Sequence, residues 1–213
     1  MESTEIQLYR KAWLLSLFTI FYNVVEGIIS MLMGYQDETL TLFGFGVDSF
    51  IEVVSGIGVA VMIRRIQQNP ASSKSEFEIN ALRITGYSFF VLSAGLLAGM
   101  VINVLQHHRP ETTLWGVLIS LISIVVMIWL MNAKKSTGKQ LHSDPIVADA
   151  NCTKICVYMS VILLVSSLIY EFTGFAYADL IGSAGLIYFS ISEGREALEK
   201  AKGKECCSCH CEK

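Results

Sequence analysis

Four residues in two apolar stretches of this sequence have the types and the spacing of metal ligands. Asp48 and Glu52 are four residues apart, and so are Cys152 and Cys156. On a helix, a spacing of four puts both side chains on one face. Carboxylate oxygen and thiolate sulfur both bind Zn²⁺, and thiolate also suits softer ions. Two helices that each present such a pair can therefore enclose a four-coordinate cation.

The two pairs carry unequal weight as functional signals. A buried cysteine is often only a small hydrophobe that fills space, so the Cys152–Cys156 pair has a plain packing explanation. An ionisable group within a bilayer costs roughly 2.5–3.5 kcal/mol on insertion scales, so two acids on one helix face have no such explanation. Asp48 and Glu52 are therefore the stronger half of the predicted site.

Other polar residues in apolar stretches are weaker candidates for an ion path or for support of the site. Asn23 and Glu26 could line such a path, or could only form hydrogen bonds between helices. Asp149 lies near the start of a predicted helix, where the helix dipole also favours an acid for structural reasons. Asp179 lies near the start of the last apolar stretch.

The C-terminal segment is a second candidate for metal binding. It concentrates thiol and imidazole groups within six residues, at Cys206, Cys207, Cys209, His210 and Cys211. Such a density of soft ligands is typical of a chelating tract, although a flexible tail with incidental cysteines has the same composition. A reducing cytosol would disfavour disulfides among these cysteines.

Composition indicates which elements hold these residues. The sequence is 53% hydrophobic and 16% charged, against about 25% charged residues in soluble domains. Apolar runs of about 20 residues, enough for a helix to cross a bilayer, alternate with short polar connectors. We therefore predict an all-α membrane protein with a six-helix transmembrane domain over residues 1–200 and a cytosolic Cys-rich tail over 201–213. The predicted spans are 12–33, 39–64, 82–106, 112–132, 146–170 and 175–197.

The basic residues predict the orientation of the six spans. With this number of spans, all of the 16 Lys and Arg residues except Arg109 and Lys154 fall on one side. Basic residues are enriched in cytoplasmic loops, so both termini should be cytoplasmic. Lys134, Lys135 and Lys139 fall in a predicted Lys/Ser/Gly linker between the fourth and fifth spans. The loops are too short for a catalytic module, which argues against an enzyme.

With these residues in view, the sequence resembles the cation diffusion facilitator family of divalent-metal transporters over residues 12–197. FGFGVDSFIEVVSG is similar to that family's helix-two motif, with Asp48 and Glu52 at the ligand positions. VADANCTKICVYMS is similar to the helix-five motif, with Cys152 and Cys156 at the ligand positions. YADLIGSAGLIYFSISEGREAL is similar to the helix-six region and puts Asp179 at the family's usual aspartate, and Asn23 matches a common asparagine of helix one. The resemblance implies six helices, cytosolic termini and alternating access.

Two departures from the family pattern bear on function. Cys152 and Cys156 stand where the family usually has His and Asp, which favours thiophilic ions. The family's cytosolic C-terminal domain has no counterpart in this sequence, and we expect the Cys-rich tail to stand in its place. Dimerisation, which that domain usually supports, would then have to come from the membrane helices of a homodimer.

These features predict transport of a divalent heavy-metal cation, Zn²⁺ or a more thiophilic ion, across the cell membrane. Four ionised ligands would place four negative charges in a low-dielectric site, and a divalent ion offsets only two. Protons should therefore enter as the metal leaves, which favours export from the cytosol by proton antiport. The expected partners are the bilayer, metal cations and protons, with no organic cofactor and no nucleic acid.

Two other functions remain open at this stage. The chain could be a membrane redox protein that uses Cys152 and Cys156 as a dithiol, and a Cys152→Ser variant with full metal transport but no thiol exchange would favour it. It could also be a non-transporting metal sensor or resistance accessory whose tail binds the ion. Deletion of residues 205–213 discriminates between this alternative and a transporter, because a transporter should keep its turnover without the tail.

Overall fold

The computed structural model describes residues 3–37, 39–69, 76–106, 113–175 and 177–202. The side chains of a few helical residues in these ranges, Cys152 among them, are outside the described part. The predicted tail ligands, at residues 206–211, lie outside it as well. The described residues form helices and no strand, which confirms the predicted all-α class. The helices are α1 (Ser3–Gln36), α2 (Leu40–Gln68), α3 (Glu76–Gln106), α4 (Leu114–Gln140), α5 (Asp144–Thr173) and α6 (Tyr177–Ala201).

Each helix matches one predicted span, but most extend beyond the apolar run that predicted them. Large differences occur at α1, which begins at Ser3 instead of residue 12, and at α4, where the predicted Lys/Ser/Gly linker is wrong because the helix continues to Gln140. Lys and Gln are good helix formers, and the single Gly138 costs only about 1 kcal/mol relative to Ala. Hydropathy marks the apolar part of a helix, whereas propensity carries the helix further.

Five of the six helices are long and apolar enough to cross a membrane. These are α1 to α5, with the qualifying part of α3 starting at Leu82 and that of α5 at Thr153. By the same measure α6 does not qualify, since charged residues such as Asp179 and Glu193 interrupt its apolar sequence. The protein is therefore a multi-pass membrane protein, and a sixth span remains a prediction.

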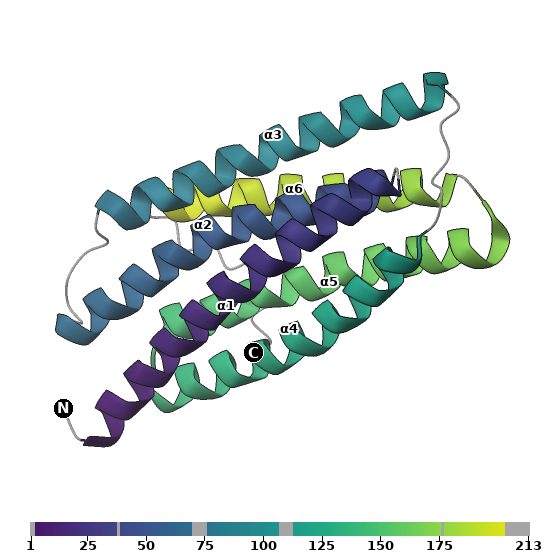
Figure 1. Cartoon of the computed structure of the whole chain (residues 1–213). Helices are drawn as coiled ribbons and strands as arrows, with labels where there is room; N and C mark the ends of the chain where they lie inside the picture. The colour runs from purple at the N-terminus through teal and green to yellow at the C-terminus, as the bar shows by residue number, and fades with distance from the viewer. Residues whose placement is uncertain (1–2, 38, 70–75, 107–112, 176, 203–213) are drawn as a thin grey trace, which may run out of the picture.

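The helices run alternately up and down, so the bundle has two distinct ends (Figure 1). One end holds the first residues of α1, α3 and α5 and the last residues of α2, α4 and α6, and is called here the terminal end. The other end holds the α1–α2, α3–α4 and α5–α6 connections, and is called here the opposite end. The most extensive packing joins α1 to α2, α4 to α5, and α3 to α6. Positive-inside placement predicts that the terminal end faces the cytosol.

Two glycines let α1 and α2 pack closely beside the predicted ligands. A Cβ atom on Gly46 would lie 3.0 Å from the backbone oxygen of Gly27, and one on Gly27 would lie 3.0 Å from the backbone oxygen of Gly46. Small residues at a helix–helix contact permit such close approach in membrane proteins. The contact sets the register in which polar residues of α1 meet the acids of α2.

At the opposite end, acids from other helices satisfy the helix N-termini. The carboxylate of Asp179 in α6 accepts hydrogen bonds from the backbone N–H groups of Leu40, at 3.1 Å, and Thr41, at 3.0 Å. Glu171 in α5 accepts from the backbone N–H of Thr113, the residue before α4, at 3.3 Å. An anion at a helix N-terminus stabilises exposed N–H groups and the helix dipole. These contacts favour a structural role for Asp179.

Candidate metal centre

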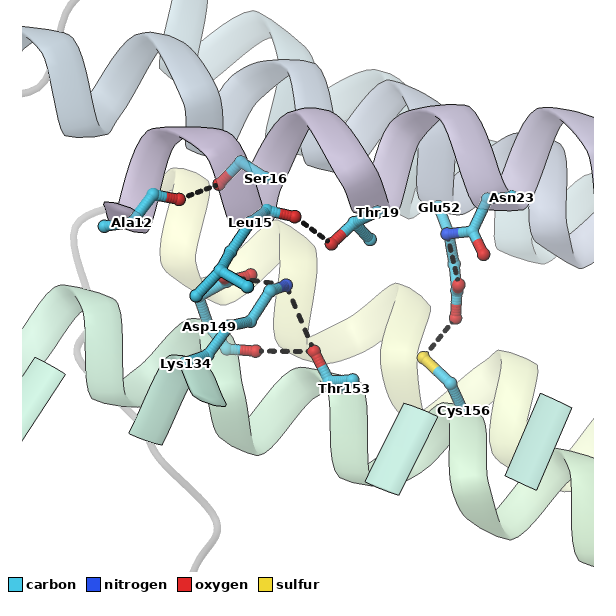
Figure 2. A network of polar contacts seen from close by, with 10 residues as sticks. All are labelled: Ala12, Leu15, Ser16, Thr19, Asn23, Glu52, Lys134, Asp149, Thr153 and Cys156. Atoms are coloured by element: carbon cyan, nitrogen blue, oxygen red, sulfur yellow. Dashed lines mark hydrogen bonds and ion pairs between the residues drawn. The ribbon is translucent and has the colours of Figure 1, made fainter. Parts of the chain in front are cut away.

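A chain of hydrogen bonds joins three helices at the predicted ligands (Figure 2). The side-chain amide of Asn23 in α1 donates to Oε2 of Glu52 in α2, at an N–O distance of 2.8 Å. The thiol of Cys156 in α5 donates to the other carboxylate oxygen of Glu52. The structure thus brings one member of the acidic pair and one member of the cysteine pair into direct contact.

Asp48, the other acid of the pair, is buried one turn along α2 from Glu52. Its side chain is 2% exposed, and its Oδ1 atom has no hydrogen-bond partner among the described residues. A buried polar atom without a partner costs about 1–3 kcal/mol, so such atoms are uncommon in native structures. The carboxylate charges of Glu52, Glu193 and Glu26 lie within electrostatic range of Asp48. A cation or protons would relieve both the missing partner and the accumulated negative charge.

The described side chains account for three of the four predicted ligands. Cys152 lies on α5 one turn from Cys156, toward the terminal end, and its side chain is outside the described part of the chain. Among the side chains that the structure does describe, no group of three His, Cys, Asp or Glu residues forms a ready metal site. The Glu52–Cys156 contact is therefore the part of the predicted constellation that can be examined directly.

On the side of this contact toward the opposite end lies a second buried acid, Glu26. Its side chain is 6% exposed. The hydroxyl of Tyr22 donates to Oε1 of Glu26 at 2.8 Å, and the hydroxyl of Ser49 donates to Oε2 at 3.2 Å. Asn23 and Glu26 belong to a stripe of buried polar residues along α1, which also contains Ser16, Thr19 and Ser30.

On the side toward the terminal end, Lys134 of α4 forms a buried ion pair with Asp149 of α5. The Nζ–Oδ2 distance is 2.9 Å, and the two side chains are only 5% and 12% exposed. The same ammonium group donates to the hydroxyl of Thr153 at 3.2 Å (Figure 2). Asp149 is thus neutralised by a cation, which favours a structural role for this residue.

Lys134 and Glu193 are charged residues near the site that the sequence-based prediction missed. Lys134 was placed in a linker because the hydropathy ends before it. The buried face of α4 nevertheless continues at helical spacing through Leu130, Lys134 and Thr137, and that periodicity is the signal that could have found it. Glu193 on α6 lies within electrostatic range of Glu52 and Cys156. Glu193 lies within the helix-six segment quoted above, but no ligand-type residue four positions away marked it as a candidate.

Comparison with known proteins identifies the family to which this helical bundle belongs. The cation efflux transmembrane domain matches residues 12–202. The chain belongs to the cation efflux family. The family resemblance inferred from the motifs around Asp48 and Cys156 is thereby confirmed. Cation efflux proteins are membrane transporters, and the Asn23–Glu52–Cys156 hydrogen-bond chain of this member lies within helices that can cross a bilayer.

A similar curated protein is an uncharacterized transporter from Methanocaldococcus jannaschii. It is 26% identical over 175 residues, which cover 80% of this cation efflux chain and 61% of the relative. The chain thus spans about three fifths of the relative's length.

Proposed function

We propose that this cation efflux chain transports a divalent heavy-metal cation across the membrane, with Zn²⁺ favoured or a more thiophilic ion. The ligands in this proposal are Asp48, Glu52, Cys152 and Cys156. The observation that carries it is the contact between the Glu52 carboxylate and the Cys156 thiol, contributed by two different helices. The unpartnered Oδ1 of Asp48, one turn away, supports it.

The Glu52–Cys156 hydrogen bond also supports coupling to protons. Metal ligands must be deprotonated, so a metal that binds both groups displaces the proton they share. Re-protonation of the ligands on the other side of the membrane would complete an antiport cycle. Export from the cytosol follows from an inward proton gradient, with the terminal end facing the cytosol. A homodimer formed by the membrane helices, in the cell membrane, belongs to the same proposal.

The experiment is uptake of Zn²⁺ into proteoliposomes under a pH gradient. Asp48→Ala and Glu52→Gln should each abolish uptake, because each removes a charged ligand for which the bilayer interior offers no replacement. Glu196→Gln is the matched control, since Glu196 pairs on the surface of α6 with Lys200, at an O–N distance of 2.7 Å. Wild-type uptake by Asp48→Ala or by Glu52→Gln would contradict the proposed site.

A further inference from the structure

Glu26 is a buried acid whose described contacts include no basic group. They are the Tyr22 hydroxyl, the Ser49 hydroxyl and Ser123 of α4. The charged and titratable groups around it are Tyr22 on its own helix, Asp48 and Glu52 on α2, and Cys156 on α5 beyond Glu52. The basic residue of α4, Lys134, pairs with Asp149. A buried carboxylate without a cationic partner is costly to keep ionised.

The neutral donors around Glu26 are too few to satisfy an ionised carboxylate. Tyr22 gives one full hydrogen bond. Ser49 has a single hydroxyl proton, which it shares between Glu26 Oε2, at 3.2 Å, and the backbone oxygen of Phe45, at 3.1 Å. An ionised carboxylate has about four lone-pair sites for donors. The two described donors therefore leave most of its acceptor capacity unused.

The hydroxyl of Ser123 on α4 adds little donor capacity for Glu26. Ser160 donates to the backbone oxygen of Cys156 at 2.8 Å, so Ser123 is the donor in the Ser123–Ser160 hydrogen bond of 2.9 Å. A hydroxyl has one proton, so any contact of Ser123 with Glu26 shares the proton that Ser123 gives to Ser160. The few donors described around Glu26 fit a neutral acid better than an ionised carboxylate.

A further unsatisfied atom lies on the same stripe of α1, one turn from Glu26. Asn23 is fully buried and donates to Glu52, while its Oδ1 atom has no partner in the described part of the chain. A buried acceptor without a donor is costly, so a donor such as water at this atom would stabilise the polar stripe of α1.

We propose that Glu26 carries a coupling proton at a site separate from the metal ligands. This inference rests on the proposed metal/proton antiport. Glu26 is protonated when the metal has left the Asp48–Glu52–Cys156 centre, because nothing then offsets the local negative charge. When the divalent cation binds, its positive charge favours the ionised form, and Glu26 releases its proton to the aqueous phase. No bond is formed or broken other than the O–H bond of the carboxylic acid.

The test is the number of protons exchanged for each Zn²⁺ in proteoliposomes. It is read from the pH gradient that just stops net Zn²⁺ flux against a fixed Zn²⁺ gradient. In Glu26→Gln this ratio should fall by one, while exchange of labelled for unlabelled Zn²⁺ without a pH gradient persists. Thr19→Val is the matched control, because this buried hydroxyl on the same stripe donates only to its own helix, at Leu15. It should keep the wild-type ratio.

The outcomes separate this inference from the proposed function. A wild-type ratio in Glu26→Gln overturns the role of Glu26 and leaves antiport intact. A wild-type protein without any proton coupling overturns both. If Glu26→Gln does not fold, Tyr22→Phe serves instead. Loss of the Tyr22 hydroxyl removes a donor to the ionised carboxylate, so proton release should need a higher pH and the pH profile of transport should shift upward. An unshifted profile then counts against Glu26.

Discussion

An acid lies on each side, or flank, of the Glu52–Cys156 contact, and the two acids have different partners. Toward the terminal end, the acid Asp149 is neutralised by Lys134 within a buried ion pair. Toward the opposite end, the acid Glu26 has only hydroxyl partners among its described contacts. The first arrangement has a fixed charge balance, whereas the second is balanced only when a proton is present. Under the proposal for Glu26, the flank that contains Lys134 and Asp149 contributes stability, and the flank that contains Glu26 exchanges a proton.

The flank with the ion pair should be the more sensitive to substitution. Lys134→Ala leaves Asp149 buried and unpaired, which we expect to lower the free energy of unfolding by about 3–5 kcal/mol. The loss should appear as a lower midpoint of thermal unfolding in detergent.

Two controls sharpen this prediction. Lys200→Ala breaks the more exposed pair with Glu196 and should cost only about 0.3–0.5 kcal/mol, as for other i,i+4 pairs. The double variant Lys134→Met/Asp149→Leu should recover most of the lost stability, since an apolar pair can replace a buried ion pair. If Lys134→Ala were as stable as the wild type, the ion pair would not be the stabilising flank.

Asn23 lies at the junction between the two flanks, and its loss should weaken metal binding without abolishing it. Asn23→Ala removes the donor that orients Glu52. Outer partners of metal ligands are typically worth about 10–100-fold in metal affinity. Isothermal titration of purified protein with Zn²⁺ checks this, with Thr19→Val as control. Unchanged affinity would mean that Asn23 does not support the site.

Neutralisation of Glu26 should have little effect on the stability of the protein. Glu26→Gln keeps an acceptor for the Tyr22 hydroxyl and removes a buried charge, so stability should change by no more than about 1 kcal/mol. The same thermal measurement that detects the Lys134→Ala deficit applies here. A loss as large as that of Lys134→Ala would show that Glu26 is ionised and structurally essential, and the contrast between the flanks would disappear.

Removal of the Cys-rich tail should have the smallest effect on turnover. Neither flank includes residues 205–213, so a chain without them should transport Zn²⁺ at the wild-type maximal rate. Its apparent affinity or its regulation by metal is expected to change, as thiol and imidazole groups at this density bind soft ions. Initial rates over a range of Zn²⁺ concentrations separate the two effects. A lost maximal rate would favour a sensor or delivery role over transport by the helices.

The sequence predicted the helices and the ligand faces well, because both follow from local periodicity. Apolar runs located every helix, and the i,i+4 spacing correctly put Asp48 and Glu52 one turn apart on α2. The partners of these residues could not be predicted in the same way. The Asn23–Glu52 bond joins residues 29 apart in sequence, and the Cys156–Glu52 bond joins residues 104 apart. Such contacts depend on how the helices pack, which local patterns do not record.

Lys134 shows the same limit of local sequence patterns for a residue outside the apolar runs. A lysine beyond the end of an apolar run is normally solvated, and it was counted among the loop residues that set the orientation. In the folded protein it is 4% exposed, because α4 continues and α5 presents Asp149 to it. Only the packing of α4 against α5 distinguishes a buried lysine from an exposed one.

X-ray absorption spectroscopy of the Zn²⁺-bound protein tests the central claim most directly. The full chain is used with Cys206, Cys207, Cys209 and Cys211 each changed to Ser, so that sulfur ligands can come only from α5. We predict sulfur at about 2.3 Å and oxygen at about 2.0–2.2 Å from the zinc. The sulfur signal should disappear when Cys152 and Cys156 are also changed to Ser. A zinc ion with only nitrogen or oxygen ligands in the parent protein would contradict a site shared between α2 and α5.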